Sequence, residues 1–138
     1  MVQAKVCHIT TGHSPFDDRI FYKEAISLAR NGFDVSLLAP MGQDGALRDM
    51  GSSTVAYKEC VKEQVRIKGF VRSDPFPKLR QLGQLNKWAH LLWDREQFSL
   101  GRPFTEALHL AIGERADVYH CHEIEALWVG LLAKRSLL

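Results

Sequence analysis

The chain has 138 residues, and its 18 lysines and arginines stand against 16 aspartates and glutamates, a net charge of +2. This length corresponds to about one domain on the usual range of roughly 100–200 residues. Hydrophobic residues at 46% and charged residues at 25% exclude a disordered tail, a collagen-like repeat and a disulfide miniprotein. The small charge excludes nucleic acid as a bulk electrostatic partner.

The sequence also lacks the signals of membrane insertion and export. No apolar run approaches the ~20 residues that span a bilayer, and the N-terminal residues do not form a signal peptide. We therefore predict a cytoplasmic location. Cys7, Cys60 and Cys121 are odd in number and have no CxxC spacing, so we expect reduced, mostly buried thiols and no disulfide framework or zinc knuckle.

The first 40 residues predict a βαβ unit. Residues 5–10 are β-branched and apolar and end at a Thr-Gly turn, which is typical of a buried strand. Asp17 and Asp18 then precede a helical apolar stripe that ends at Asn31-Gly32. Residues 33–40 are nearly continuously apolar, as parallel strands covered on both faces are.

The middle of the chain is less regular. Residues 54–59 and 64–71 resemble strands, and the second alternates apolar with basic side chains, which favours a half-exposed edge strand or a hairpin. Beyond Pro75 and Pro77, leucines at helical spacing predict a helix over residues 79–98.

The last third returns to alternating elements. We predict a short helix from Ala107 to about Gly113 or Arg115, a strand over residues 117–122 and a helix over residues 123–138. Strands that alternate with helices imply an α/β fold, a parallel sheet with helices on both faces. Because the alternation is still running at Leu138, we expect the chain to be a truncated domain.

A ligand site is expected at the carboxyl ends of the strands, where the strand order reverses. Two loops meet this description, residues 11–13 and residues 122–123, and each precedes a helix N-terminus that offers free N–H groups. The first loop lacks GxGxxG and the sequence has no GxxxxGK[ST], which argues against a dinucleotide and against ATP hydrolysis by a P-loop.

Two motifs resemble those of a known family. The first spans residues 13–35 and begins HSPFDDRIFYKEA; the second spans residues 117–133 and begins DVYHCHE. Both are similar to N-domain motifs of group 1 (family 4) glycosyltransferases, which are retaining enzymes of the GT-B fold. The resemblance implies that residues 1–138 are the acceptor-side, Rossmann-like, doubly wound N-terminal half of such an enzyme, in a truncated form. A C-terminal domain, absent here, would bind the nucleotide-sugar donor, which is a substrate, so no separate cofactor is expected.

The resemblance also implies site residues. His122 is the catalytic candidate, because an imidazole can hydrogen-bond a sugar hydroxyl or stabilise developing charge; the alternative is a histidine that caps the following helix. The acceptor-binding candidates from the two motifs are Gly12, His13, Asp17, Arg19 and Glu123.

Each of these candidates has an alternative. Gly12 either lets a ligand approach the backbone or supplies a positive φ. Asp17 and Arg19 could equally form a helix cap and an ion pair that fixes the loop. Glu123 stands where the family usually has Asp. His120 lies on the same side of its strand as His122, but two ligands make a poor metal site, and we predict none.

The partners follow from the same resemblance. The acceptor would be a glycan or a lipid-linked sugar in polysaccharide biosynthesis. The basic excess of residues 58–80, followed by Trp88 and Trp93, could dock on the inner face of a membrane, or it could be a solvated face beside packed tryptophans. An unpaired outer edge on strand 117–122 predicts self-association unless the last helix covers it. The alternative function is a naturally short, non-catalytic recruiting subunit that works with a separate donor-binding chain.

Overall fold

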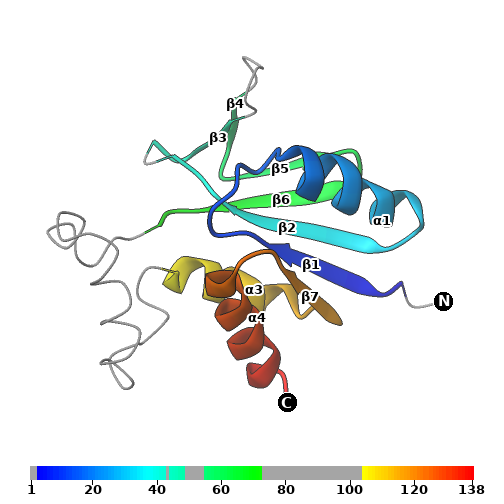
Figure 1. Ribbon diagram of the computed structural model, residues 1–138, viewed down its shortest axis with the longest axis vertical. Coiled ribbons are helices and arrows are strands. Elements are labelled where there is room, and N and C mark those ends of the chain that lie inside the picture. Colours follow the sequence, from blue (N-terminus) through cyan, green and yellow to red (C-terminus); the bar gives the residue numbers. More distant parts are fainter. Residues whose placement is uncertain (1–2, 43, 49–54, 73–103) are drawn as a thin grey trace, which may run out of the picture.

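The computed structural model describes residues 3–42, 44–48, 55–72 and 104–138 and shows an α/β fold built on a five-stranded, mostly parallel sheet (Figure 1). The strands lie in the order β5-β6-β2-β1-β7. Four of them run parallel, and β5 at one edge is antiparallel to β6. Their bounds are β1 Lys5–Ile9, β2 Asp34–Pro40, β5 Glu59–Lys62, β6 Val65–Phe70 and β7 Val118–Cys121.

Helices cover both faces of this sheet (Figure 1). On one face, a π-helical segment, η1 (Asp18–Ala25), continues directly as α1 (Ile26–Arg30). On the other face lie α3 (Thr105–Glu114) and α4 (Ile124–Ser136). Two short strands, β3 (Ala46–Arg48) and β4 (Val55–Tyr57), form a separate antiparallel ribbon.

Two apolar cores fill the space between these layers because successive strand residues point to opposite faces. Val35 and Leu37 of β2 pack with the η1–α1 side. Leu38 packs with Cys7 and Ile9 of β1 on the α3–α4 side. Burial on both faces explains the nearly continuous apolar character of β2.

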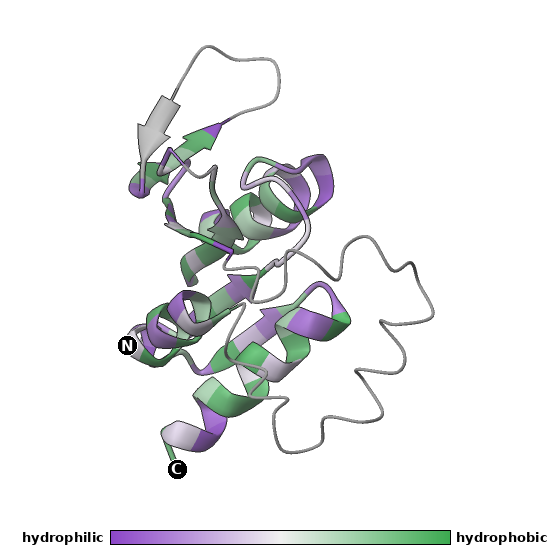
Figure 2. Ribbon diagram, turned by 90° about the vertical axis from the view of Figure 1, so that its left-hand side faces the viewer, coloured by the Kyte–Doolittle hydropathy of each residue, from purple (hydrophilic) through white to green (hydrophobic). Residues whose placement is uncertain are grey.

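Helix α4 packs closely on the sheet through small residues. A Cβ added to Gly130 would lie 2.5 Å from Cys121 Sγ, so glycine is required for this separation. The opposite side of α4 carries exposed apolar side chains, which makes the helix hydrophobic along most of its length (Figure 2). They are Ile124, Leu127, Trp128, Leu131 and Leu132.

Most predicted elements are confirmed where the structure describes them, and the middle of the chain needs a correction. Residues 64–71 are not an edge strand: β6 lies inside the sheet between β5 and β2. The hairpin alternative is confirmed, since β5 and β6 pair antiparallel. Of the strand predicted over 54–59, the described residues 55–59 are divided between β4 and β5 by Lys58, whose φ of +38° breaks the strand. The helix predicted over 79–98 lies outside the described residues.

The strand order places the ligand-binding end of the sheet. After β1 the chain moves to one side, to β2 and β6, and then returns to β7 on the other side of β1. The order therefore reverses between β1 and β7, where open parallel sheets bind ligands at the carboxyl ends of their strands. Within the described residues, no helix is long and apolar enough to cross a bilayer.

Candidate functional site

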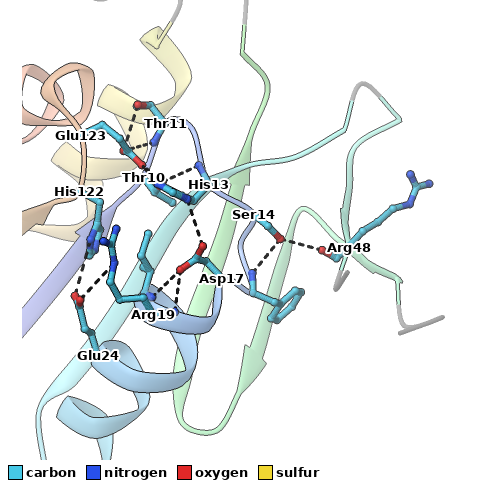
Figure 3. Close-up of polar contacts among 12 residues, drawn as sticks. Thr10, Thr11, His13, Ser14, Asp17, Arg19, Glu24, Arg48, His122 and Glu123 are labelled. Atoms are coloured by element: carbon cyan, nitrogen blue, oxygen red, sulfur yellow. Dashed lines mark hydrogen bonds and ion pairs between the residues drawn. The ribbon is translucent and has the colours of Figure 1, made fainter. Parts of the chain in front are cut away.

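Two loops lie together at this point, and we call them the loop pair: residues 10–16 after β1 and residues 122–123 after β7 (Figure 3). The carboxylate of Glu123 joins them. Its Oε1 accepts a 2.6 Å hydrogen bond from Thr10 Oγ1, and its Oε2 accepts a 2.9 Å bond from the Thr11 amide. The predicted meeting of the two loops is confirmed.

His13 lies between two carboxylates of the loop pair (Figure 3). Its Nδ1 is 3.3 Å from Asp17 Oδ2, and its Nε2 is 3.4 Å from Glu123 Oε1. The side chain is 42% exposed, so it remains accessible to a ligand. Its backbone amide donates to Thr10 Oγ1 at 3.1 Å.

Asp17 caps the helix that follows the first loop. Its Oδ1 accepts from the amides of Ile20, at 3.0 Å, and Arg19, at 2.9 Å. These hydrogen bonds hold the pKa of Asp17 below its ordinary value. The predicted cap is confirmed, and the N–H groups that it occupies are not free for a ligand.

Arg19 does not pair with Asp17. Its guanidinium Nε lies 4.0 Å from Glu24 Oε1 within the same helix, and the side chain is 60% exposed. The carboxylate of Asp17 instead lies 3.3 Å from Nδ1 of His13. Figure 3 shows the Arg19 side chain directed towards Glu24 and His122.

Gly12 is exposed at the tip of the first loop. Its φ is not positive, so the alternative of a left-handed turn is wrong. An added Cβ would meet Glu123 Oε1 at 3.8 Å, an ordinary van der Waals contact. Neither the backbone conformation nor the packing therefore requires glycine at position 12. The remaining interpretation of Gly12 is that it lets a ligand approach the backbone closely.

His122 faces protein groups. Its side chain is 4% exposed; Nε2 lies 3.0 Å from Nδ1 of the buried His8, and Nδ1 lies 3.9 Å from Glu24 Oε2. Burial and the neighbouring His120 lower the pKa of His122. In this arrangement His122 holds a position beneath the loop pair and does not present a free nitrogen to a sugar.

The start of α4 is the other helix end at the loop pair. Glu123 occupies the N-cap position, yet its carboxylate reaches back to the first loop and caps no amide of its own helix. The N-terminal amides of α4 therefore have no side-chain cap. Such amides suit an anionic or hydroxyl-rich ligand.

The predicted basic surface is engaged within the fold where the structure describes it. Lys58 pairs with Glu106 at 3.1 Å, and Lys68 pairs with the buried Glu114 at 2.7 Å. Lys62 lies over three aromatic rings, and Arg72 lies over Phe104. These contacts favour a structural role for the described part of the segment; residues 78, 80, 88 and 93 lie outside it.

The cysteines lie outside the loop pair. Cys7, Cys60 and Cys121 are free thiols. Burial raises the pKa of Cys7 to about 12 and also raises the pKa values of Cys60 and Cys121. None of them is activated as a nucleophile.

Sequence reasoning missed four residues that build this region: Thr10 and Thr11, which bind Glu123, and His8 and Glu24, which contact His122. The threonines stand at the carboxyl end of β1, a position that could have identified them. His8 reads as one more residue of a buried strand, and the contact of Glu24 depends on how η1 packs.

Comparison with known proteins adds no relative: no family model, curated protein or solved structure matches the chain.

Proposed function

We propose that the chain is the acceptor-binding domain of a retaining glycosyltransferase, the N-terminal, Rossmann-like half of a GT-B fold. The observation that carries the proposal is the pair of hydrogen bonds that Glu123 accepts from the Thr10 hydroxyl and the Thr11 amide. It joins the two segments whose motifs resemble one enzyme family, at the end of the sheet where ligands bind. A second domain, on the same polypeptide or on a separate chain, would bind the nucleotide-sugar donor.

The chemistry of the loop pair suits a sugar acceptor. Sugar hydroxyls both donate and accept hydrogen bonds, and the loop pair offers an accessible imidazole, two carboxylates and uncapped helix amides. Gly12 leaves room beside Glu123 for a ring to approach the backbone. His13, Glu123 and the α4 amides would bind the acceptor, with Asp17 orienting His13, and with His122 supporting them from below.

The proposal retains the acceptor class expected from the sequence, a glycan or a lipid-linked sugar, and a cytoplasmic location. The proposal differs from the sequence prediction in the role of His122. A side chain that is 4% exposed fits a positioning residue better than a catalytic one. The recruiting-subunit alternative shares the same acceptor site and differs only in where the donor domain resides.

The test is a binding titration followed by NMR on the ¹⁵N-labelled chain, with a panel of oligosaccharides and short-chain polyprenyl-phosphate sugars. We expect saturable shifts at the amides of residues 11–14 and 123–126 with at least one ligand. Uridine and guanosine diphosphates should leave these amides unshifted, because the donor nucleotide binds to the other domain.

A matched pair of variants sharpens the test. Glu123→Gln should weaken sugar binding at least about tenfold, whereas Glu125→Gln, which removes the neighbouring exposed carboxylate on α4, should not. The proposal is wrong if no member of the panel binds, or if shifts occur away from the loop pair.

A further inference from the structure

Four side chains with metal-binding groups converge beside the loop pair: His8, Glu24, His120 and His122. One ligand atom from each lies within 4.8 Å of all the others. The residues come from β1, from η1 and from β7 with its following loop. Chain segments more than one hundred positions apart therefore meet at one point.

The sheet register explains the three histidines. His8 lies directly opposite His120 in the parallel pairing of β1 with β7. His122 follows His120 by two positions and so points to the same face. The three rings lie with centroids 4.4–5.3 Å apart.

Helix η1 covers this face and brings the carboxylate. Glu24 Oε2 lies 3.7 Å from His120 Nδ1 and 3.9 Å from His122 Nδ1. Both distances are too long for hydrogen bonds. The oxygen is buried and has no hydrogen-bond partner.

His8 is the least solvated member. It is fully buried, and its Nε2 also lacks a hydrogen-bond partner. Burial, with His120 and His122 nearby, lowers the pKa of His8 to about 3. Two unpartnered buried polar atoms in one cluster are costly for a protein and call for a physical explanation.

We infer that His8, Glu24, His120 and His122 bind one divalent transition-metal ion, for which Zn²⁺ is the best fit. Three imidazole nitrogens and one carboxylate oxygen form the mixed N/O set that Zn²⁺ accepts in tetrahedral geometry. Zn–N bonds of about 2.0–2.1 Å place neighbouring ligand atoms about 3.3 Å apart. In the structure, with one ligand atom taken from each residue, these atoms lie within 4.8 Å of one another, so they must approach by up to about 1.5 Å to reach this separation.

To bind one ion, the four ligand atoms must move closer together. The partly exposed side chains can make this movement. His120 and Glu24 have 48% and 33% exposed side chains, whereas His8 is buried and fixed in β1. His122 presents Nε2 to His8 and Nδ1 to Glu24, and it binds the ion through one of the two.

Four protein ligands close the coordination sphere, which is typical of a structural metal. The ion would join β1, η1 and β7 directly beneath the loop pair and so fix the two loops that carry the motifs. This inference does not depend on the proposed sugar acceptor, because metal binding is measured on the chain without any sugar.

The experiment uses the purified chain after treatment with a chelator. Zn²⁺ is titrated by calorimetry in competition with a chelator of known affinity, and Co²⁺ is used as a spectroscopic probe. We expect one equivalent of Zn²⁺, a rise in the unfolding temperature on binding, and the intense visible absorption of tetrahedral Co²⁺ without thiolate-to-cobalt charge transfer.

Exposed ligands provide variants that should still fold. His120→Ala and Glu24→Gln should each weaken Zn²⁺ affinity at least about tenfold, with circular dichroism confirming the fold. His109→Ala, which removes an exposed histidine on α3 outside the cluster, is the matched control and should leave the affinity unchanged. The inference is overturned by substoichiometric binding, by a thiolate spectrum, or by an affinity that His120→Ala does not lower more than His109→Ala.

Discussion

The hydroxyl of Thr10 donates a 2.6 Å hydrogen bond to Glu123 Oε1 across 113 positions of sequence. Thr10 is fully buried, and its oxygen also accepts from the His13 amide at 3.1 Å. One hydroxyl thus orders its own loop and ties it to the start of α4. The two motifs of the sequence are coupled through this oxygen.

Thr10→Val should reveal the strength of this tie. Valine keeps the shape and loses the hydroxyl, so a charged acceptor loses a short hydrogen bond, at a cost of about 1.5–3 kcal/mol in the free energy of unfolding. Thr11→Val is the control, because the Thr11 hydroxyl lies 3.4 Å from Glu123 and its backbone amide bond remains. Urea unfolding measures the free energy of unfolding of both variants. Equal decreases would show that the Thr10 hydrogen bond contributes no more to stability than the Thr11 hydroxyl does.

The cap of η1 gives a second prediction. Asp17→Ala leaves the Arg19 and Ile20 amides without their acceptor and should lower stability by about 1 kcal/mol. Asp17→Asn retains a side-chain oxygen and should lose distinctly less. Thermal unfolding of the three proteins checks the order, and an Asn variant as unstable as the Ala variant would contradict it.

The sequence predicts the strands and helices well because their burial patterns are local. It fails at β6, where Arg66 and Lys68 look like a solvent-facing row. In the fold these cations lie 3.8 and 2.7 Å from Glu114, whose side chain is 1% exposed. A buried acid on α3 satisfies them, and only the packing of α3 against the sheet reveals it.

Glu114 also predicts an acid dependence of stability. Burial raises the pKa of Glu114, but hydrogen bonds from Lys68 and Lys5 outweigh it, so the pKa lies below its ordinary value. A carboxyl whose pKa is depressed by folding stabilises the protein above its unfolded pKa and loses this contribution as the pH falls through the folded pKa. Stability should therefore decline below about pH 4.5.

Glu114→Gln isolates this contribution. At pH 7 it should cost roughly 2–3 kcal/mol, somewhat less than a fully buried pair, because Lys5 and Lys68 are about a quarter exposed and can reach water. Its stability should also fall less steeply than that of the parent chain below pH 4.5. Unfolding in urea at several pH values tests both; parallel profiles would assign the acid dependence to other carboxyls.

Two helical glycines should respond in opposite directions to alanine. Gly130→Ala places a methyl 2.5 Å from Cys121 Sγ and should cost about 1–2 kcal/mol despite the gain in helix propensity. Gly113→Ala on α3 meets nothing within 4 Å and should gain up to about 1 kcal/mol. Thermal unfolding compares them, and a stabilised Gly130→Ala would mean that α4 can shift away from the sheet.

The sequence predicts only part of the candidate site, because the other part depends on tertiary packing, as the contacts of Glu114 do. The loops that carry His13 and Glu123 follow from the rule that parallel strands end at one edge. The cluster around His122 does not, because it requires the register that places His8 opposite His120 and the packing of η1 that delivers Glu24. The second motif contains only His120 and His122, which are two of the four proposed metal ligands.

The position of β1 in the sheet affects how the chain is made. Val6 pairs with Val35 on one side and with Val118 on the other. During synthesis β1 can acquire its first neighbour early, whereas its second side stays open until Val118–Cys121 have left the ribosome. Pairing across so long a stretch of chain is slow, and an open strand edge invites foreign strands. In a crowded polysome, β7 must therefore compete with neighbouring nascent chains for the same row of amides and carbonyls.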